Sequence, residues 1–415
     1  MQTMKNRRDL LKLLGAGAAL GALAPLAGCG GGDAEATEAL ADNLLDTTPA
    51  NQAATYRHVD RIAATRVVAR GGSVLSLPAH ATPLDALQYE FGGQTLTVGD
   101  YMQRNRTSGL LILQGGAVAL ERYGMGSDAA SRWTTFSVAK SITSTLVGAA
   151  LADGSIGSLD DRVTRYLPAL NGTAYADNTI RELMRMCSGV RWDETYSASG
   201  DSDIARLSQA LKANRPGSML ELMASRPRAA APGSVFNYST GESFVLGAIV
   251  AAATGKNLSD YLSDKVWRRA GMEADAYWLL EAEGGLEMGG DNLSATLRDY
   301  GRLGRFLMHG AEAVLPGGWM ALAGHPDNAV TDYGQLYAGY PLGYGYQWWS
   351  FPRGAAALPY MDGAFTAEGI FGQFLYIDPQ RDLVAVVLSA WPAAWVDAAE
   401  YETYAMLATA AATLG

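Results

Sequence analysis

The chain has 415 residues, of which 48% are hydrophobic and 18% are charged, and its formal net charge at pH 7 is −10. This composition is typical of a soluble protein with enough apolar mass for a large buried core. The acidic balance argues against nucleic acid as a partner, because there is no basic surplus to neutralise phosphates.

The first residues predict an export signal. Arg7 and Arg8 stand before a Leu-, Ala- and Gly-rich run that ends in the tetrapeptide LAGC at Cys29. The pattern resembles a bacterial twin-arginine signal joined to a lipobox, which implies removal of residues 1–28 and attachment of lipid to the Cys29 thiol. A plain membrane anchor over residues 10–28 is the alternative, although its many small residues make it a weak span. We therefore expect an exported lipoprotein, periplasmic or on the cell surface, that is held at a membrane by its lipid.

The segment after Cys29 is acidic and poor in large apolar side chains, so residues 29–55 are predicted to be a flexible linker. Residues 56–415 then form the folded domain. Its one cysteine, Cys187, leaves no internal disulfide available. We interpret Cys187 as a small core residue; a nucleophilic thiol is the alternative, but no histidine is close to it in the sequence.

The remaining pattern predicts strands at both ends of this domain and helices between them. Residues 109–123 form two apolar runs around a Gly-Gly turn, and residues 372–391 form a second hairpin pattern. Residues 137–310 show mostly helical spacing, and an Ala-rich stretch closes the chain as a helix. The expected fold class is α+β: one antiparallel sheet built from the N- and C-terminal segments and flanked by helices, with a large, mostly helical second lobe. The cleft between the lobes is the expected site.

Ser137 and Lys140 are the first candidate catalytic residues. They lie three residues apart where an extended segment turns helical, so both side chains share one helix face. Free N–H groups and the helix dipole at that end favour developing negative charge, and a Lys140 whose pKa is lowered by burial could take the serine proton. From these residues alone, a capping serine and a surface lysine are an equal alternative.

Other nucleophile schemes and metal centres find less support. The sequence has no G-x-S-x-G motif. Its four histidines are scattered, without the paired spacing of a zinc site (His58, His80, His309 and His325). We therefore expect neither a metal nor an organic cofactor.

Three segments carry a family resemblance: FSVAKSITS, PGSVFNYSTGESFVLGAIV and GIFGQFLYIDP. In this order they resemble the serine β-lactamase and penicillin-binding-protein superfamily, in particular the esterase and amidase branch that includes 6-aminohexanoate-dimer hydrolase. The resemblance implies that Ser137 is the acylated nucleophile, Lys140 its proton acceptor and Tyr238 a catalytic tyrosine, with Thr240 in the substrate site. A phenol beside an ammonium ionises more easily, so Tyr238 could pass a proton to the leaving group. Without the matching neighbours, a half-buried loop aromatic would be the preferred reading of Tyr238.

The third motif departs from the family pattern. Where β-lactamases carry K-T-G, this chain has Ala367-Glu368-Gly369, and alanine offers no cation for a penicillin carboxylate. Gly369 still allows a close backbone approach, so the N–H groups of Ile370 and Ser137 are the expected oxyanion hole, with a plain strand start as the alternative. Ester or amide hydrolysis thus remains favoured over β-lactamase or DD-peptidase activity.

Further substrate contacts are expected from aromatic residues. The resemblance places Tyr196 on a loop that closes over substrate, with plain packing of that loop as an equal alternative. Trp349 could line an apolar acyl pocket or belong to the core. Asp201 and Asp203 are candidates for binding a substrate amine, although solvated loop acids are the simpler interpretation. The prediction is a serine hydrolase of small esters or amides. The alternatives are a β-lactamase or DD-peptidase, a nylon-oligomer-type amidase, and a non-catalytic binder with this fold.

Overall fold

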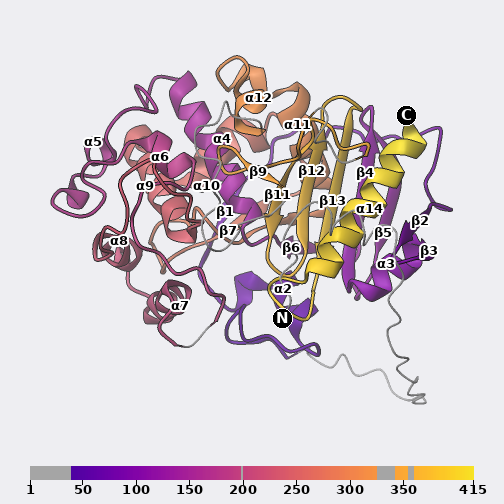
Figure 1. Ribbon diagram of the computed structural model, residues 1–415, viewed down its shortest axis with the longest axis horizontal. Coiled ribbons are helices and arrows are strands. Elements are labelled where there is room, and N and C mark those ends of the chain that lie inside the picture. Colours follow the sequence, from indigo (N-terminus) through magenta and orange to yellow (C-terminus); the bar gives the residue numbers. More distant parts are fainter. Residues whose placement is uncertain (1–38, 198–199, 325–341, 354–358) are drawn as a thin grey trace.

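The computed structural model describes residues 39–197, 200–324, 342–353 and 359–415. The predicted signal peptide and Cys29 lie outside these residues. The described chain forms two regions, a large sheet with its covering helices and a mostly helical lobe beside it (Figure 1).

The large sheet has seven antiparallel strands in the order β5-β4-β13-β12-β11-β10-β9. Both predicted hairpins are confirmed, and they lie side by side in the sheet, where Leu111 of β4 is paired with Val386 of β13. The sheet is thus assembled from the two ends of the domain, as expected. Its strands are β4 (Thr107–Gln114), β5 (Ala117–Tyr123), β9 (Gly343–Tyr344), β10 (Trp349–Ser350), β11 (Phe365–Gly369), β12 (Gln373–Asp378) and β13 (Leu383–Ser389).

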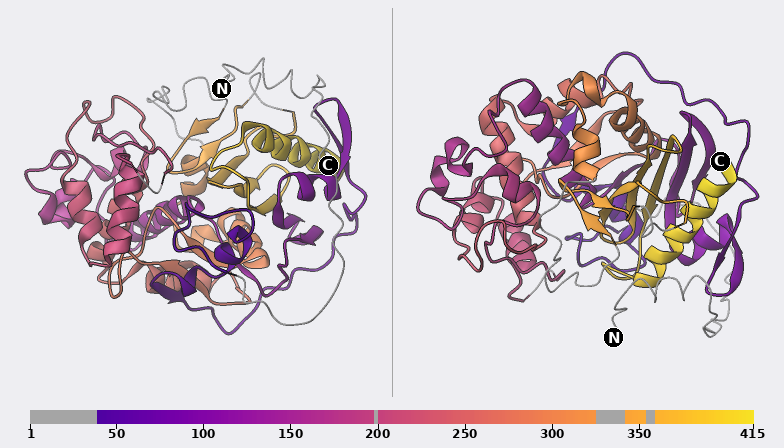
Figure 2. Two further views of the ribbon diagram at one scale, coloured as in Figure 1. Left: turned by 90° about the horizontal axis from the view of Figure 1, so that it is seen from below. Right: turned by 45° about the horizontal axis from the view of Figure 1, so that its top comes forward.

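Helices cover both faces of this sheet. The predicted C-terminal helix α14 (Asp397–Leu414) lies across one face, as Figures 1 and 2 show. Its buried side chains belong to one apolar cluster with Ile112 and Phe374 of the sheet. On the other face lie α4 (Val138–Ala152) and α11 (Leu297–His309), against alternate residues of the same strands. Because the sheet is buried on both sides, β4 and β13 are almost continuously apolar.

The second lobe surrounds α4 and the helix packed against it, α9 (Thr240–Thr254). A small sheet of order β1-β7-β8-β6, which the sequence analysis did not anticipate, closes this region. Its strands are β1 (Thr65–Val68), β6 (Arg132–Thr134), β7 (Ala276–Leu279) and β8 (Leu293–Thr296). The lobe's other helices are α5 (Val163–Tyr166), α6 (Ile180–Met184), α7 (Asp203–Ala213), α8 (Ser218–Ala224), α10 (Leu258–Leu262) and the π-helical turn η3 (Ser263–Trp267).

The remaining elements are short. They are α2 (Gln52–Arg57), η1 (Val59–Arg61), β2 (Gln88–Phe91), β3 (Gln94–Thr97), α3 (Val98–Arg104), η2 (Pro168–Leu170), η4 (Ala311–Ala313) and α12 (Trp319–Gly324). Cys187 is buried, and this burial raises the pKa of its thiol to about 12, in agreement with a core residue. Within the described part of the chain, no helix has both the length and the apolarity needed to cross a bilayer.

The N-terminal boundary of the folded region differs from the predicted one. Residues 39–55 were assigned to the linker, but the backbone N–H of Ala41 donates to Thr55 Oγ1 over 2.9 Å and Ala41 is buried. Leu44 and Leu45 also pack against the core. The acidic composition of the segment concealed these few apolar anchors, and the folded region begins before residue 56.

Candidate active site

Ser137 lies at the junction between β6 and α4. The residue before it, Phe136, has φ = 48°, a left-handed conformation that is uncommon for a non-glycine residue. Its ring is held edge-on by Tyr56 and in tilted contact by Phe371, with centroids 5.0 and 5.3 Å away. This packing fixes the sharp turn that places Ser137 at the N-terminus of α4, where it is only 7% exposed.

Lys140 meets Ser137 on the same face of α4, as the spacing predicted. Its Nζ lies 2.8 Å from three oxygens: Ser137 Oγ, Thr240 Oγ1 and the carbonyl oxygen of Gly290. A neutral amine has two protons to donate and one lone pair. If Thr240 and Gly290 accept the two protons, the lone pair faces the hydroxyl of Ser137. The same site also suits the ammonium formed by proton transfer, which then has three acceptors.

The surroundings favour the neutral amine in part. Lys140 is 1% exposed, and this burial lowers its pKa. The carboxyl groups of Glu194 and Asp291 act in the opposite direction and raise it. Burial and the two acids thus shift the pKa of Lys140 in opposite directions. A balance of this kind suits a group that accepts and then releases a proton during a reaction.

Glu194 is a buried residue of this site that the sequence analysis missed. Its carboxylate accepts hydrogen bonds from the backbone N–H of Thr240 over 2.9 Å, from Thr240 Oγ1 over 2.5 Å, and from the indole of Trp192. A chain of hydrogen bonds thus runs from Lys140 through Thr240 to Glu194. The only signal in the sequence was its position two residues before Tyr196, which drew attention to the tyrosine alone.

Tyr238 comes from the loop before α9 and is 4% exposed. Lys140 Nζ lies 4.9 Å from the centre of its ring. The ring of Trp349 is stacked on this tyrosine, with centroids 5.9 Å apart and ring planes inclined by 17°. Trp349 is 4% exposed and belongs to the same buried cluster as Tyr238, which agrees with the core alternative given for it above.

The strand β11 approaches the nucleophile closely at Gly369. A Cβ atom added there would lie 2.2 Å from the carbonyl oxygen of Thr135, so only glycine permits this contact. The next residue, Ile370, lines the same pocket as Ser137. Glu368 is buried on the opposite face, where it accepts a hydrogen bond from Tyr404 of α14 over 2.6 Å. The position of the missing motif lysine is taken by Ala367, so this strand offers the pocket no cation.

A pocket of about 900 Å³ opens from Ser137. Near the nucleophile it is lined by Thr240, Tyr196, Ile370 and Asp291. Tyr196 is half-buried, and its hydroxyl lies 3.3 Å from Glu194 Oε1. Two further walls come from segments remote in sequence: Asp42, Asn43, Leu44 and Leu45 of the N-terminal region, and Ile204, Leu207, Ser208 and Leu211 of α7.

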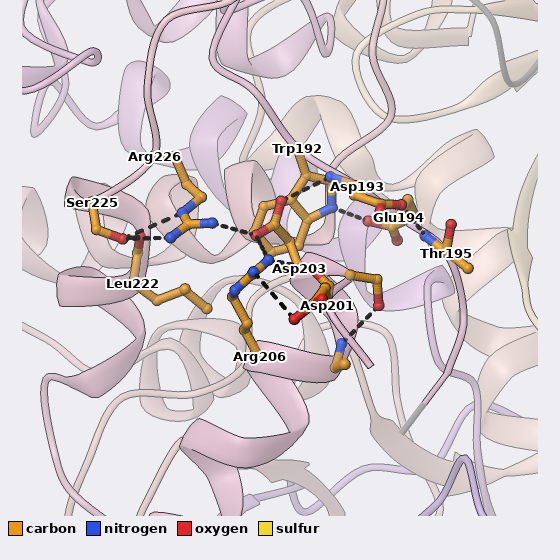
Figure 3. A network of polar contacts seen from close by, with 12 residues as sticks. Trp192, Asp193, Glu194, Thr195, Asp201, Asp203, Arg206, Leu222, Ser225 and Arg226 are labelled. Atoms are coloured by element: carbon orange, nitrogen blue, oxygen red, sulfur yellow. Dashed lines mark hydrogen bonds and ion pairs between the residues drawn. The ribbon is translucent and has the colours of Figure 1, made fainter. Parts of the chain in front are cut away.

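Asp201 and Asp203 do not line this pocket. Asp203 is 2% exposed and forms ion pairs with Arg226 and Arg206 at 2.7 and 3.3 Å (Figure 3). It also accepts the backbone N–H of Asp193 over 2.9 Å. Asp201 is exposed and lies 3.9 Å from Arg206. Asp203 secures the loop that carries Glu194, and neither acid lies where it could bind a substrate amine in this pocket.

Comparison with known proteins agrees with this geometry. The family model described as Beta-lactamase matches residues 95–410. The chain belongs to the Beta-lactamase family. It is 30% identical over 302 residues to a 6-aminohexanoate-dimer hydrolase of Paenarthrobacter ureafaciens, an alignment that covers 70% of this chain and 74% of that protein.

Solved structures of Beta-lactamase fold agree as well. A Bacillus anthracis protein provisionally named as a 6-aminohexanoate-dimer hydrolase superposes with a TM-score of 0.79 and 23% identity, over 92% of this chain and 99% of that one. A hydrolase with promiscuous acyltransferase activity superposes with a TM-score of 0.56 and 19% identity, over 75% and 96% of the two chains. The predicted α+β fold is confirmed, and the protein is a hydrolase of the Beta-lactamase family.

Proposed function

We propose that this protein is a serine hydrolase that cleaves small carboxylic esters or amides through an acyl-enzyme on Ser137. The observation that supports this best is the contact of Lys140 Nζ with Ser137 Oγ at 2.8 Å, made while two other acceptors orient the same amine. A serine with a buried, deprotonated lysine as partner is an activated nucleophile.

The reaction follows from these positions. Ser137 Oγ attacks the substrate carbonyl while its proton passes to Lys140, and the N–H groups of Ser137 and Ile370 stabilise the oxyanion. When the tetrahedral intermediate collapses, the bond to the leaving group breaks, and Tyr238 relays a proton from the ammonium to the departing alkoxide or amine. Water then adds to the acyl carbonyl by the reverse proton path and releases the carboxylic acid and free Ser137.

Two alternatives receive less support. A β-lactamase or DD-peptidase binds a carboxylate, whereas this chain has Ala367 at the position of the motif lysine. A nylon-oligomer amidase, the activity named for the relative from Paenarthrobacter ureafaciens, would require an amine site at Asp201 or Asp203 in our reading. Asp203 is committed to two arginines instead. The apolar side chains of α7 and of Leu44 and Leu45 fit an uncharged acyl group better.

The decisive experiment uses a fluorophosphonate probe together with p-nitrophenyl esters, aminohexanoate dimer and nitrocefin. We expect the wild type to be labelled and to hydrolyse the esters fastest. The variant Ser137→Ala should lose both properties, and Tyr238→Phe should reduce turnover by about 10²-fold. The matched control is Ser141→Ala on the same helix, whose hydroxyl donates to the carbonyl of Gln347 and not to Lys140. Labelling of Ser137→Ala at the wild-type rate, or failure to label folded wild type, would refute the proposal.

We also propose that the enzyme is an exported lipoprotein, anchored through Cys29. The sequence pattern around Arg7, Arg8 and Cys29 supports this. Mass spectrometry of the protein from its native membrane should find lipid on the N-terminal cysteine after loss of 28 residues. An N-terminus that still contains Arg7 would contradict it.

A further inference from the structure

A loop between β7 and β8 brings one more charged side chain to the nucleophile. The carbonyl of Gly290 in this loop accepts the hydrogen bond from Lys140, and the next residue is Asp291. The backbone of Asp291 is fixed at both ends, because its N–H donates to the carbonyl of Met288 over 2.9 Å and its carbonyl accepts the indole N–H of Trp278 over 3.0 Å. Asp291 therefore cannot move away from the amine without breaking the loop.

The following residue holds the loop in an unusual conformation. Asn292 has φ = 55°, in the left-handed region, and its side-chain oxygen accepts a hydrogen bond from Thr134 Oγ1 over 2.9 Å. Thr134 ends β6, three residues before Ser137. The loop that carries Asp291 is thus tied directly to the strand that delivers the nucleophile, and backbone strain of this kind is typical of functional sites.

Asp291 is half-buried and lines the pocket together with Ser137 and Thr240. Within the described ranges it forms no ion pair with Lys, Arg or His at 4.0 Å or less. The other pocket-lining residues around Ser137 carry no charge: Phe136, Tyr196, Thr240, Asn292 and Ile370. Among the residues that the structure describes, a carboxylate is therefore the one charged group that this part of the pocket wall presents to an acyl group.

The remaining charges of the pocket lie on other segments and include both signs. Arg66 is paired with Glu287 at 2.7 Å, and Glu281 accepts the N–H groups of Gly217 and Met219. The exposed charged residues of the lining are Asp42, Asp60, Arg61, Lys212 and Glu283. Exposed charges of mixed sign are screened and largely cancel, so they impose little selection. A half-buried charge beside the nucleophile is screened much less.

We propose that Asp291 is a specificity-determining residue, whose carboxylate disfavours substrates with a negative charge close to the scissile carbonyl and admits neutral or cationic ones. The inference rests on the serine hydrolase function proposed above. Ala367 provides no cation that would attract an anionic acyl group, and the carboxylate of Asp291 would in addition repel one. Both features select against the same class of substrates.

The charge of Asp291 depends on pH. Burial raises the pKa of this carboxyl to about 7, while the Lys140 amine lowers it and the Glu194 carboxylate raises it. These two groups, with the Tyr56 phenol of α2, are the titratable neighbours coupled to it. Since a carboxyl is charged above its pKa, the discrimination against anions should be weak well below pH 7 and strong above it.

The test compares two esters of equal acyl length, p-nitrophenyl butyrate and mono-p-nitrophenyl succinate. The butyryl group ends in a methyl, whereas the succinyl group ends in a carboxylate that stays ionised above about pH 5.5. We expect Asp291→Asn to raise the ratio of kcat/KM for succinate over butyrate by about 10-fold at pH 8.5, where each tenfold equals about 1.4 kcal/mol. The control Asp201→Asn changes an acid outside the pocket and should leave the ratio within about twofold, the range expected of a distant exposed charge.

A second measurement needs no variant. In the wild type, the succinate-to-butyrate ratio should fall by about fivefold or more between pH 5.5 and 8.5 as the carboxyl ionises. A constant wild-type ratio, or an Asp291→Asn ratio that equals that of the wild type, overturns the inference. The proposed function fails separately, if the wild type neither hydrolyses butyrate nor reacts with the fluorophosphonate probe.

Discussion

The two ends of the pocket are built in different ways. At the nucleophile, Ser137, Lys140 and Thr240 are each less than 10% exposed and are joined by hydrogen bonds of 2.8 Å. At the other end, the half-exposed Leu44 and Leu45 line the pocket with apolar side chains of α7, and a side-chain hydrogen bond from Asn43 to Ser208 links the two segments. The first end is held by directional hydrogen bonds between buried groups, whereas the second, with its apolar contacts, can tolerate changes of shape.

We therefore expect the nucleophile end to set the reaction rate and the other end to set which acyl groups are accepted. A buried amine is costly unless all its protons and its lone pair have partners, so removal of a group that contacts Lys140 Nζ should have a large effect on rate. Apolar contacts at the other end are non-directional and contribute in proportion to area. Changes there should alter which acyl groups are accepted while leaving the proton transfers intact.

The largest effect is expected at Lys140. Replacement by alanine removes the proton acceptor of Ser137 and should lower kcat/KM for p-nitrophenyl butyrate by 10²-fold or more, where about 10²- to 10⁴-fold is usual for general base catalysis. Lys140→Arg provides the sharper test, because a guanidinium keeps the positive charge but cannot be deprotonated. We expect it to be as inactive as the alanine variant.

The outcome that would contradict this assignment is substantial activity in Lys140→Arg. Positive charge alone would then suffice, and the amine would not act as a base. Thermal unfolding of both variants controls for loss of the fold, since Lys140→Ala leaves Thr240 and Gly290 without their donor and Lys140→Arg places a larger group in a buried site.

A smaller effect, with a shift in pH dependence, is expected at Glu194. Its carboxylate accepts hydrogen bonds from Thr240, Trp192 and Tyr196, and it raises the pKa of Lys140. Replacement by glutamine removes the negative charge. It also places an NH₂ group, which cannot accept a hydrogen bond, among the donors of Thr240 and Trp192. We expect kcat/KM to fall by about 10-fold, and the acid limb of its pH profile to move to lower pH, because Lys140 then loses its proton more readily.

The direction of the shift distinguishes this role from simple packing. A variant that merely loosened the loop would lose activity equally at all pH values. Glu194→Asp, which keeps the charge, should restore the position of the acid limb even if the rate remains low. A limb that moves to higher pH in Glu194→Gln would show that Glu194 does not act on Lys140.

The same contrast explains how much could be predicted from the sequence. The pair Ser137 and Lys140 is local, since a helical spacing of three residues alone brings the groups together, and both hairpins of the large sheet follow from turn residues between apolar runs. Glu194 could not be found in this way, because its partner Thr240 is 46 residues away and its burial depends on tertiary packing. The small sheet was missed for a similar reason, since its four strands are three or four residues long and pair across the chain.

The structure differs from the sequence-based expectation at two places where long-range packing, which no local pattern reveals, determines the environment. Asp203 reads as a loop acid, yet two arginines pair with it in the interior. The acidic segment before residue 56 reads as a free linker, yet Leu44 and Leu45 are drawn onto the core. In both cases the average composition of the segment predicts an exposed, unpaired chain, whereas contacts of a few side chains bury part of it.

The smallest effect is expected from the hydrogen bond that holds this N-terminal segment to α7. Asn43 Nδ2 donates to Ser208 Oγ over 2.5 Å, and Asn43 Oδ1 accepts the N–H of Leu45. Asn43→Ala should lower kcat/KM about threefold for p-nitrophenyl decanoate, as the loss of one net hydrogen bond predicts, and should leave the acetate ester unchanged. Ser208→Ala should behave in the same way, and the double variant should be no worse than either single one because both remove the same bond. Equal losses for decanoate and acetate would mean that this wall supports the nucleophile as well, and the division between a rigid reaction centre and an adjustable acyl wall would no longer hold.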